Sequence, residues 1–245
     1  IPPLQWFAER LYPDAEVTVL VDAEADPHTF SARPSQLRAM AEADVWMRVG
    51  MPFEQTFTDM AAEMDGLVVL LLGDDEGHTP AQDHNQHSCA DDPHVWLDPG
   101  FAFRVAHAWE QTQLALRGVS PAFNWGAPAL EDELEERLRS HRGKRFFVLH
   151  SAFGHFAEAF GLEQVAIESD GRAPSPRQLR AVTQTIREAG ATTLFVTPRD
   201  NRAVAEAIAQ SARVTVTVLD PLQADWLAML REIGDALAAD FAARP

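Results

Sequence analysis

Short apolar runs of the kind found in β-strands alternate with segments of helical period along most of this chain. In the clearest run, residues 67–72, every side chain is apolar, which is typical of a parallel strand that is buried on both faces. Parallel neighbours must be joined by a crossover of about a dozen residues or more, usually a helix. The alternation therefore predicts an α/β fold built from βαβ units.

The expected elements fall into two series with a helical segment between them. The first series has helices over residues 3–11, 35–43, 53–64 and 101–116 and strands over 17–21, 45–49 and 67–72. The second has strands over 145–149, 164–167, 193–196 and 214–219 and helices over 153–160, 177–189, 201–209 and from 225 onward. We expect an N-terminal α/β lobe (1–119), a long connecting helix (120–142) and a C-terminal α/β lobe (143–245), each lobe with a mainly parallel sheet flanked by helices. Gly126 and Pro128 predict that the connecting helix either is kinked there or starts at Pro128.

Composition narrows the range of partners. Lys+Arg 20 against Asp+Glu 37 gives a formal charge of −17, which would repel a phosphate backbone, so nucleic acid is not an expected partner. Cys89 is the single cysteine, which excludes an internal disulfide. No apolar run approaches the roughly 20 residues that a membrane-spanning helix needs. The chain starts at Ile1 without a methionine, as a chain would after removal of a signal peptide.

Residues 77–99 hold four of the nine histidines and the single cysteine. Acidic and amide side chains that can orient the imidazoles lie among them, which is typical of a metal-collecting loop. The loop ends in Asp92-Pro93-His94, and Asp26-Pro27-His28 repeats this tripeptide upstream. In both, an acid that can accept a hydrogen bond and a proline that fixes the backbone precede the histidine.

Ligands of open parallel sheets bind beyond the carboxyl ends of the strands. His150 and Asp220 follow directly on two expected strands of the second series, and His28 and His94 lie on loops that leave strands of the first. Three imidazoles and one carboxylate match a tetrahedral zinc shell, whereas manganese prefers more oxygen ligands. A closed shell of four leaves no position for an activated water, which favours holding the ion over catalysis.

Each of these residues also has an ordinary structural interpretation. A lone histidine at a strand end is usually a hydrogen-bonded structural residue, and Asp-Pro is a common turn signal. The joint placement of four such residues in two similar series favours the metal interpretation. His78, His84 and His87, with Cys89, predict either a second, weaker metal site or a solvated loop with chance histidines, and the spacing favours neither.

Several motifs resemble the cluster A-I solute-binding proteins of bacterial ABC importers, the receptors that bind metal ions, and within them the zinc-uptake branch. The motifs are Asp26-Pro27-His28-Thr29-Phe30, Asp92-Pro93-His94-Val95-Trp96, His150-Ser151-Ala152-Phe153, Pro174-Ser175-Pro176 and Leu219-Asp220-Pro221-Leu222. They run across nearly the whole chain in the order of that family. The resemblance implies two α/β lobes joined by one long helix, a metal ion held at their interface, and His28, His94, His150 and Asp220 as its ligands.

The resulting expectation is a zinc receptor that captures Zn²⁺ in the cleft between its lobes and passes it to an ABC permease in the inner membrane. We expect it to be a periplasmic or membrane-anchored extracytoplasmic monomer without enzymatic activity, with a metal-loading chaperone as a further candidate partner. One alternative is a manganese receptor of the same fold. The other is a zinc hydrolase, for which Glu168 or Asp170 would have to act as the general base.

Overall fold

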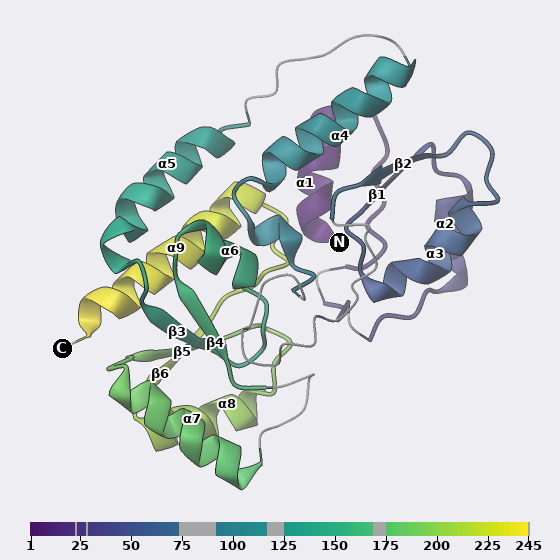
Figure 1. The fold of residues 1–245 in the computed structure, drawn as a ribbon. Coiled ribbons are helices and arrows are strands. Elements are labelled where there is room, and N and C mark those ends of the chain that lie inside the picture. Colours follow the sequence, from purple (N-terminus) through teal and green to yellow (C-terminus); the bar gives the residue numbers. More distant parts are fainter. Residues whose placement is uncertain (23, 28, 74–91, 117–124, 169–174, 245) are drawn as a thin grey trace, which may run out of the picture. The chain divides into compact units, whose positions relative to one another are not determined.

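The computed structural model describes residues 1–22, 24–27, 29–73, 92–116, 125–168 and 175–244 (Figure 1). The chain forms two compact units. The first comprises Ile1–Trp96, Gly100–Ala127 and Leu222–Trp226, and the second comprises Leu97–Pro99, Pro128–Pro221 and Leu227–Pro245. Both contain parallel strands flanked by helices, which confirms the predicted α/β class. Among the described residues, no helix has the length and apolar character that crossing a membrane requires.

The first unit contains a two-stranded parallel sheet. Its strands are β1 (Val45–Arg48) and β2 (Val68–Leu71), and its helices are α1 (Pro2–Leu11), α2 (Pro34–Ala41), α3 (Gln55–Ala61) and α4 (Phe101–Leu116), with the 3-10 turn η1 (Pro52–Glu54) before α3. Val45 lies opposite Val68 in the sheet. Met40 of α2, Trp46 of β1 and Phe57 of α3 form a buried cluster, so these two helices bury their apolar sides together with one strand.

An aromatic cluster forms the other part of this unit's core. Phe7 of α1 is fully buried. Its ring centroid lies 5.0 Å from that of Trp226, 5.4 Å from that of Trp125 and 5.5 Å from that of Phe101. The indole Nε1 of Trp226 donates a hydrogen bond of 2.6 Å to the carbonyl oxygen of Trp96. Residues from both ends of the chain therefore complete the core of the first unit.

The loop after β1 is fixed by a buried carboxylate. Glu54 accepts hydrogen bonds from the backbone N–H groups of Val49 (3.1 Å), Gly50 (2.7 Å) and Met51 (3.0 Å). Burial raises the pKa of Glu54, and the two hydrogen bonds from Val49 and Gly50 oppose that rise. This carboxylate is therefore a structural anchor with its acceptor sites directed at the backbone.

The second unit contains a four-stranded parallel sheet of order β4-β3-β5-β6. The strands are β3 (Arg145–Val148), β4 (Glu163–Ala166), β5 (Thr193–Val196) and β6 (Thr215–Val218). The helices are α5 (Ala127–Leu138), α6 (Gly154–Ala159), α7 (Pro176–Glu188), α8 (Arg202–Ala212) and α9 (Trp226–Ala243), and the 3-10 turn η4 (Arg139–His141) follows α5. In Figure 1, α7 and α8 lie on one face of this sheet, and α5, α6 and α9 lie on the other.

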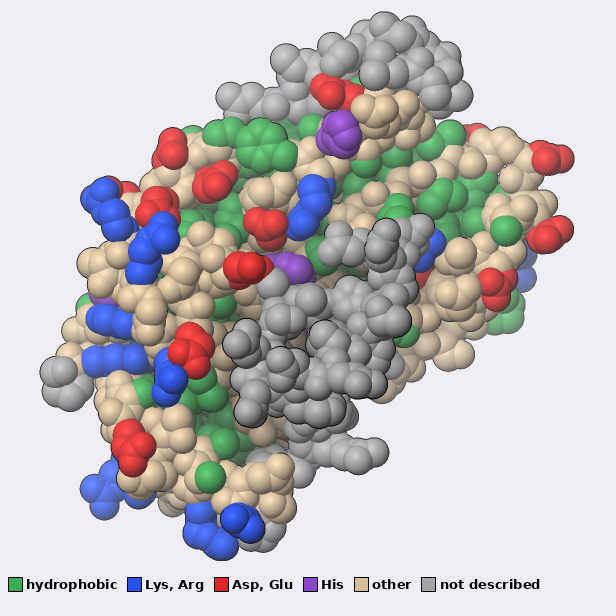
Figure 2. Space-filling model, viewed as in Figure 1, with side chains coloured by type: hydrophobic (Ala, Val, Ile, Leu, Met, Phe, Trp, Pro, Cys, Tyr) green, Lys and Arg blue, Asp and Glu red, His purple; other side chains and the backbone are tan. Residues whose placement is uncertain are grey.

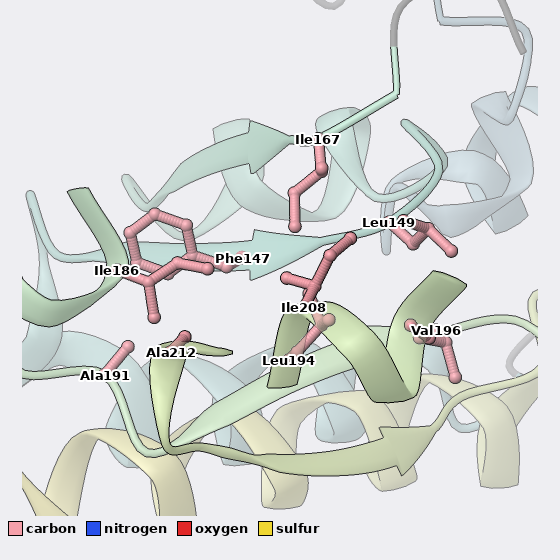
Figure 3. Close-up of a cluster of buried hydrophobic side chains, with 10 residues drawn as sticks. Phe147, Leu149, Ile167, Ile186, Ala191, Leu194, Val196, Ile208 and Ala212 are labelled. Atoms are coloured by element: carbon pink, nitrogen blue, oxygen red, sulfur yellow. The ribbon is translucent and has the colours of Figure 1, made fainter. Parts of the chain in front are cut away.

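Alternate side chains of the central strands supply the two layers of this core. Phe147 and Leu194 point toward Ile186 of α7 and Ile208 of α8 in one buried cluster (Figure 3). Phe146, the neighbour of Phe147 in the strand, belongs to the opposite face, where its ring pairs with Phe195 at 6.4 Å. A strand that is buried on both faces explains the continuous apolar run that starts at residue 146.

Among the described residues, the expected elements of the two series are present except for one strand. In the segment between the series the structure describes α5 at Ala127–Leu138, and residues 117–124 lie outside the described residues. Residues 17–21 form no strand, although Val21 is fully buried. The carbonyl of Leu20 instead accepts a 2.6 Å hydrogen bond from Nε2 of Gln36. The prediction of a strand at residues 17–21 was therefore wrong. A β-branched run indicates burial, but a strand also needs a neighbouring strand to pair with.

Candidate metal centre

His94 is a buried histidine of the first unit, and its side chain is fixed by an acid two residues earlier. The side chain of His94 is 6% exposed and that of Asp92 is 4% exposed. Oδ1 of Asp92 lies 2.6 Å from Nδ1 of the imidazole and accepts the backbone N–H of His94 at 3.0 Å. The ring also packs edge-on against Trp96, with centroids 5.2 Å apart. Asp92 thus has the hydrogen-bonding role that the sequence predicts for it.

This hydrogen bond determines which imidazole nitrogen can bind an ion. A carboxylate can only accept, so Nδ1 of His94 carries the proton and Nε2 carries the lone pair. The same pairing of carboxylate and imidazole orients histidines that bind metal through the other nitrogen. His94 therefore has the tautomer that a metal ligand needs.

The backbone beside His94 is held from two helices. Nη2 of Arg104 in α4 donates a 2.9 Å hydrogen bond to the carbonyl of Val95. Trp226 at the start of α9 donates to the carbonyl of Trp96. Val95 and Trp96 begin the 3-10 turn η3 (Val95–Leu97), so the imidazole projects from a segment with little freedom to shift.

The upstream tripeptide is described only in part. His28 lies outside the described residues, whereas its neighbours Asp26 and Thr29 lie within them. The backbone N–H of Thr29 donates to the carbonyl of Asp26 at 3.2 Å, and Oγ1 of Thr29 donates to Oδ2 of the same residue at 3.3 Å. These two bonds link Thr29 to Asp26.

The second unit carries its candidate residues at the carboxyl edge of its sheet. Hydrogen bonds of the strand ladders continue one residue past β3 and β6, from Leu149 N–H to Phe195 (3.0 Å) and from Leu219 N–H to Val196 (2.8 Å). His150 and Asp220 follow directly on these two positions. His150 is half-buried, and its Nε2 atom is shielded from solvent. Both residues therefore start from well-fixed backbone at the strand ends, as the sequence predicts.

The carboxylate of Asp220 has a cationic neighbour that sequence reasoning did not find. Nη1 of Arg199, in the loop after β5, lies 2.8 Å from Oδ1 of Asp220. The two residues are 21 positions apart, and they meet because β5 and β6 are adjacent in the sheet. The Thr-Pro-Arg-Asp turn at residues 197–200 is the sequence signal that could have pointed to this loop.

Acidic groups add negative charge to the same edge. Glu168 follows β4, and its pKa is raised by burial and, to a smaller extent, by the charge of Asp200. Asp200 belongs to the loop that also carries Arg199. The edge of this sheet thus presents an imidazole, several carboxylates and one guanidinium, a mixture suited to binding a cation.

The structure does not test the complete predicted ligand set. Within the described ranges, no three His, Cys, Asp or Glu side chains form a group that could hold a metal ion. His94 belongs to the first unit, whereas His150 and Asp220 belong to the second. His28, the loop residues His78, His84, His87 and Cys89, and the alternative base Asp170 lie outside the described residues. The four-ligand set therefore stays a prediction.

Comparison with known proteins points to one family. The model of the family ZnuA, zinc-uptake complex component A, periplasmic, matches residues 1–240. The high-affinity zinc uptake system protein ZnuA of Paracoccus denitrificans is 29% identical over 278 residues, which cover 90% of this chain and 83% of that protein. The zinc-binding protein AdcA of Streptococcus pyogenes serotype M3 is 26% identical over 243 residues, which cover 86% of this chain and 47% of AdcA. The chain thus spans about half the length of AdcA.

Solved structures agree with this match. A crystal structure of ZnuA has a TM-score of 0.84 and 30% identity, covering 98% of this chain and 96% of that one. A ZnuA deletion mutant with zinc bound has the same TM-score and identity, covering 100% and 97%. The chain therefore belongs to the ZnuA family of periplasmic zinc-uptake components.

Proposed function

We propose that this chain captures Zn²⁺ through His28, His94, His150 and Asp220 and delivers it to an ABC-type membrane permease. Membership of the ZnuA family makes it a zinc-binding periplasmic receptor of a zinc-uptake system. That membership confirms Zn²⁺ as the predicted ion and does not favour the manganese alternative. The observation that most supports the ligand assignment is the hydrogen bond from Nδ1 of His94 to Asp92, because it makes Nε2 the nitrogen that can bind an ion.

The ligand chemistry suits a transported ion. Three neutral imidazoles and one carboxylate complete a four-coordinate zinc shell, so no position is left for an activated water. The family role as an uptake component also supports transport over hydrolysis. We therefore propose that the protein has no hydrolase activity. A turnover assay with ester and phosphate substrates in the presence of zinc tests this, and metal-dependent turnover would contradict it.

The remaining features of the proposal follow from the family role. We propose a monomeric periplasmic or membrane-anchored receptor that works with an inner-membrane permease, with a metal-loading chaperone as a further partner. His78, His84 and His87 are proposed as a secondary and weaker zinc site. These three histidines are not among the four principal ligands. Removing them is therefore expected to leave the principal site in place.

The ligand assignment is tested by zinc affinity. His94→Ala and His150→Ala are each expected to weaken zinc binding by more than the roughly 10- to 100-fold that loss of an outer hydrogen-bond partner costs. The affinity is measured on metal-free protein by competition with a chromophoric zinc chelator, and circular dichroism checks the fold. His107→Ala is the matched control, because His107 is exposed on α4. A doubly substituted protein that binds zinc like the wild type would refute the assignment.

Delivery is tested in cells that lack their own zinc receptor. The intact protein is expected to restore growth in medium depleted of zinc, while the His94 and His150 variants are not. Restoration by both variants would mean that uptake does not depend on these imidazoles.

A further inference from the structure

The loop that carries His150 joins β3 to α6 and comprises residues 149–153. The sheet fixes the first residue of this loop on both sides. The backbone N–H of Leu149 donates to the carbonyl of Phe195 in β5 at 3.0 Å, and the carbonyl of Leu149 accepts the N–H of Glu168 at 3.0 Å. His150 follows directly, so the backbone before this candidate ligand is held in place.

A glutamine of the neighbouring strand fixes the backbone on the other side of His150. Gln164 belongs to β4, where it lies opposite Phe146 of β3. Its side-chain Oε1 accepts the backbone N–H of Phe153 at 2.7 Å, and its Nε2 donates to Oγ of Ser151 at 2.9 Å. One amide group therefore bonds to two of the three residues that follow His150.

The bond to Phe153 determines the orientation of this amide. A backbone N–H can only donate, so it faces the amide oxygen, and the amide nitrogen is then the group that donates to the hydroxyl of Ser151. Phe153 is the N-cap of α6 and is buried. The first N–H groups of a helix have no acceptor within the helix, and Gln164 supplies one for Phe153. The same side chain thus fixes the end of the loop and the start of the helix.

A fixed backbone matters because a metal site must hold its ligands within about 0.5 Å of the required geometry. A ligand loop that becomes ordered only when the ion binds loses conformational entropy in the binding step, which weakens the affinity. The bonds of Leu149 and Gln164 are made by groups outside the proposed ligand set, so they do not depend on the ion. They hold the backbone on both sides of His150.

We infer that Gln164 is a positioning residue for zinc binding, which holds the loop after β3 so that His150 is preorganised for the ion. This inference rests on the proposed function, in which His150 is a ligand of Zn²⁺. Gln164 acts through His150 and is not itself a ligand.

The test measures zinc affinity of metal-free protein by competition with a chromophoric chelator, and circular dichroism checks the fold. Gln164→Leu removes both hydrogen bonds and keeps a side chain of similar size. It is expected to bind zinc about tenfold more weakly than the wild type, the lower end of the range for groups that orient a metal ligand. Gln164→Glu keeps an acceptor for Phe153, and the hydroxyl of Ser151 can rotate to donate to the carboxylate. This variant is expected to bind zinc at least as tightly as the wild type, because its added negative charge also attracts the cation.

Gln184→Leu is the matched control. It makes the same substitution at an exposed glutamine of α7, whose Nε2 donates to Glu188 at 2.7 Å, and it is expected to keep the zinc affinity of the wild type. Ser151→Ala removes one of the two bonds and is expected to lose less affinity than Gln164→Leu. Unchanged affinity in Gln164→Leu, an equal loss in Gln184→Leu, or a Gln164→Glu protein as weak as Gln164→Leu would overturn the inference.

A double-mutant cycle separates positioning of the ligand from a general loss of structure. In the His150→Ala background the imidazole that Gln164 positions is absent, so adding Gln164→Leu should weaken zinc binding no further. In the His94→Ala background His150 is still present, and Gln164→Leu should weaken zinc binding as it does in the wild type. A tenfold loss in the His150→Ala background as well would show that Gln164 acts on the whole fold, and the inference would fail.

His150→Ala alone separates the inference from the proposed function. If this variant loses zinc binding while Gln164→Leu binds zinc like the wild type, the inference on Gln164 fails and the proposed function stands. If His150→Ala binds zinc like the wild type, His150 is not a ligand, and the ligand assignment fails together with the inference.

Discussion

Asp92 uses one oxygen atom for two purposes. Oδ1 accepts the backbone N–H of His94 and also lies at its Nδ1. The same atom therefore fixes the local backbone and the imidazole tautomer. Both partners are buried, so losing the carboxylate would leave polar groups without an acceptor in a place that water does not readily reach.

Replacing Asp92 should reduce zinc affinity without removing a ligand. Asp92→Ala is expected to weaken zinc binding about 10- to 100-fold, because the imidazole is no longer held in the binding tautomer. Asp92→Asn should cost less, since the amide oxygen can still accept both hydrogen bonds without the charge. Isothermal titration of the three proteins measures the difference. Asp65→Ala removes an exposed acid of the same unit and should have no effect; equal affinity in Asp92→Ala would contradict the role given to the hydrogen bond.

The sequence predicts where the polar side chains of the candidate site lie better than it predicts which groups they pair with. His150 and Asp220 stand at the strand ends where the apolar runs place them. The acceptor of His94 is two residues away, within reach of a local motif. The partner of Asp220 is not local, because Arg199 becomes a neighbour only through the pairing of β5 with β6. Sequence pattern alone does not give that strand order.

Helices α5 and α9 of the second unit approach closely at Gly234. A Cβ atom at this position would lie 2.3 Å from Cδ2 of Leu134, which is itself fully buried. The ring of Phe156 lies 3.7 Å away on another side. Glycine in the middle of an 18-residue helix lowers its intrinsic helical stability by about 1 kcal/mol relative to alanine, so the packing explains its presence.

Gly234→Ala is therefore expected to destabilise the protein despite the better helix former. The forced shift of Leu134 should cost about 1–3 kcal/mol in the free energy of unfolding, measured by urea denaturation. Adding Leu134→Ala provides room for the new methyl group, so the double variant should lose less than the sum of the two single losses. Additive losses, or a stabilised Gly234→Ala protein, would show that the two helices do not depend on this contact.

Helical period and apolar runs predict the elements of the second unit closely. The expected strands at 164–167 and 193–196 correspond to Glu163–Ala166 and Thr193–Val196. The expected strand at 17–21 is absent, since nothing in the run itself specifies a pairing partner. Helix α2 begins at Pro34, one residue before the expected start at residue 35, and the side chain of Gln36 accepts the backbone N–H of Arg33 at that end. Local patterns thus fix the kind of element better than its ends.

Charge is distributed unevenly over the whole chain. Most of the Lys and Arg residues belong to the second unit, and most of those visible in Figure 2 lie over it. One cluster there joins distant parts of the chain. The Nζ of Lys144 donates to Nδ1 of His141 at 3.1 Å, and the imidazole packs on Phe241 with ring centroids 5.1 Å apart. Burial, followed by the charges of Lys144 and Arg244, lowers the pKa of His141.

Global stability should therefore carry a contribution from His141 that disappears in acid. The folded-state pKa lies below the ordinary value of 6.5, so the contribution is fully present above that value and is lost as the pH falls through the folded pKa. Between about pH 7.5 and about pH 5.5, His141→Gln should lose less unfolding free energy than the wild type. Metal-free protein is unfolded in urea at each pH. His107→Gln, at an exposed position, should follow the wild type, and a His141→Gln curve parallel to the wild type would contradict the assignment.

The position of Trp226 has a consequence for when the core of the first unit can form during synthesis. Its indole packs on Phe7 and donates to the carbonyl of Trp96, both in the first unit. The ribosome adds this residue after all four strands of the second unit's sheet have been synthesised. The aromatic core around Phe7 therefore stays open in the nascent chain until residue 226 has been synthesised.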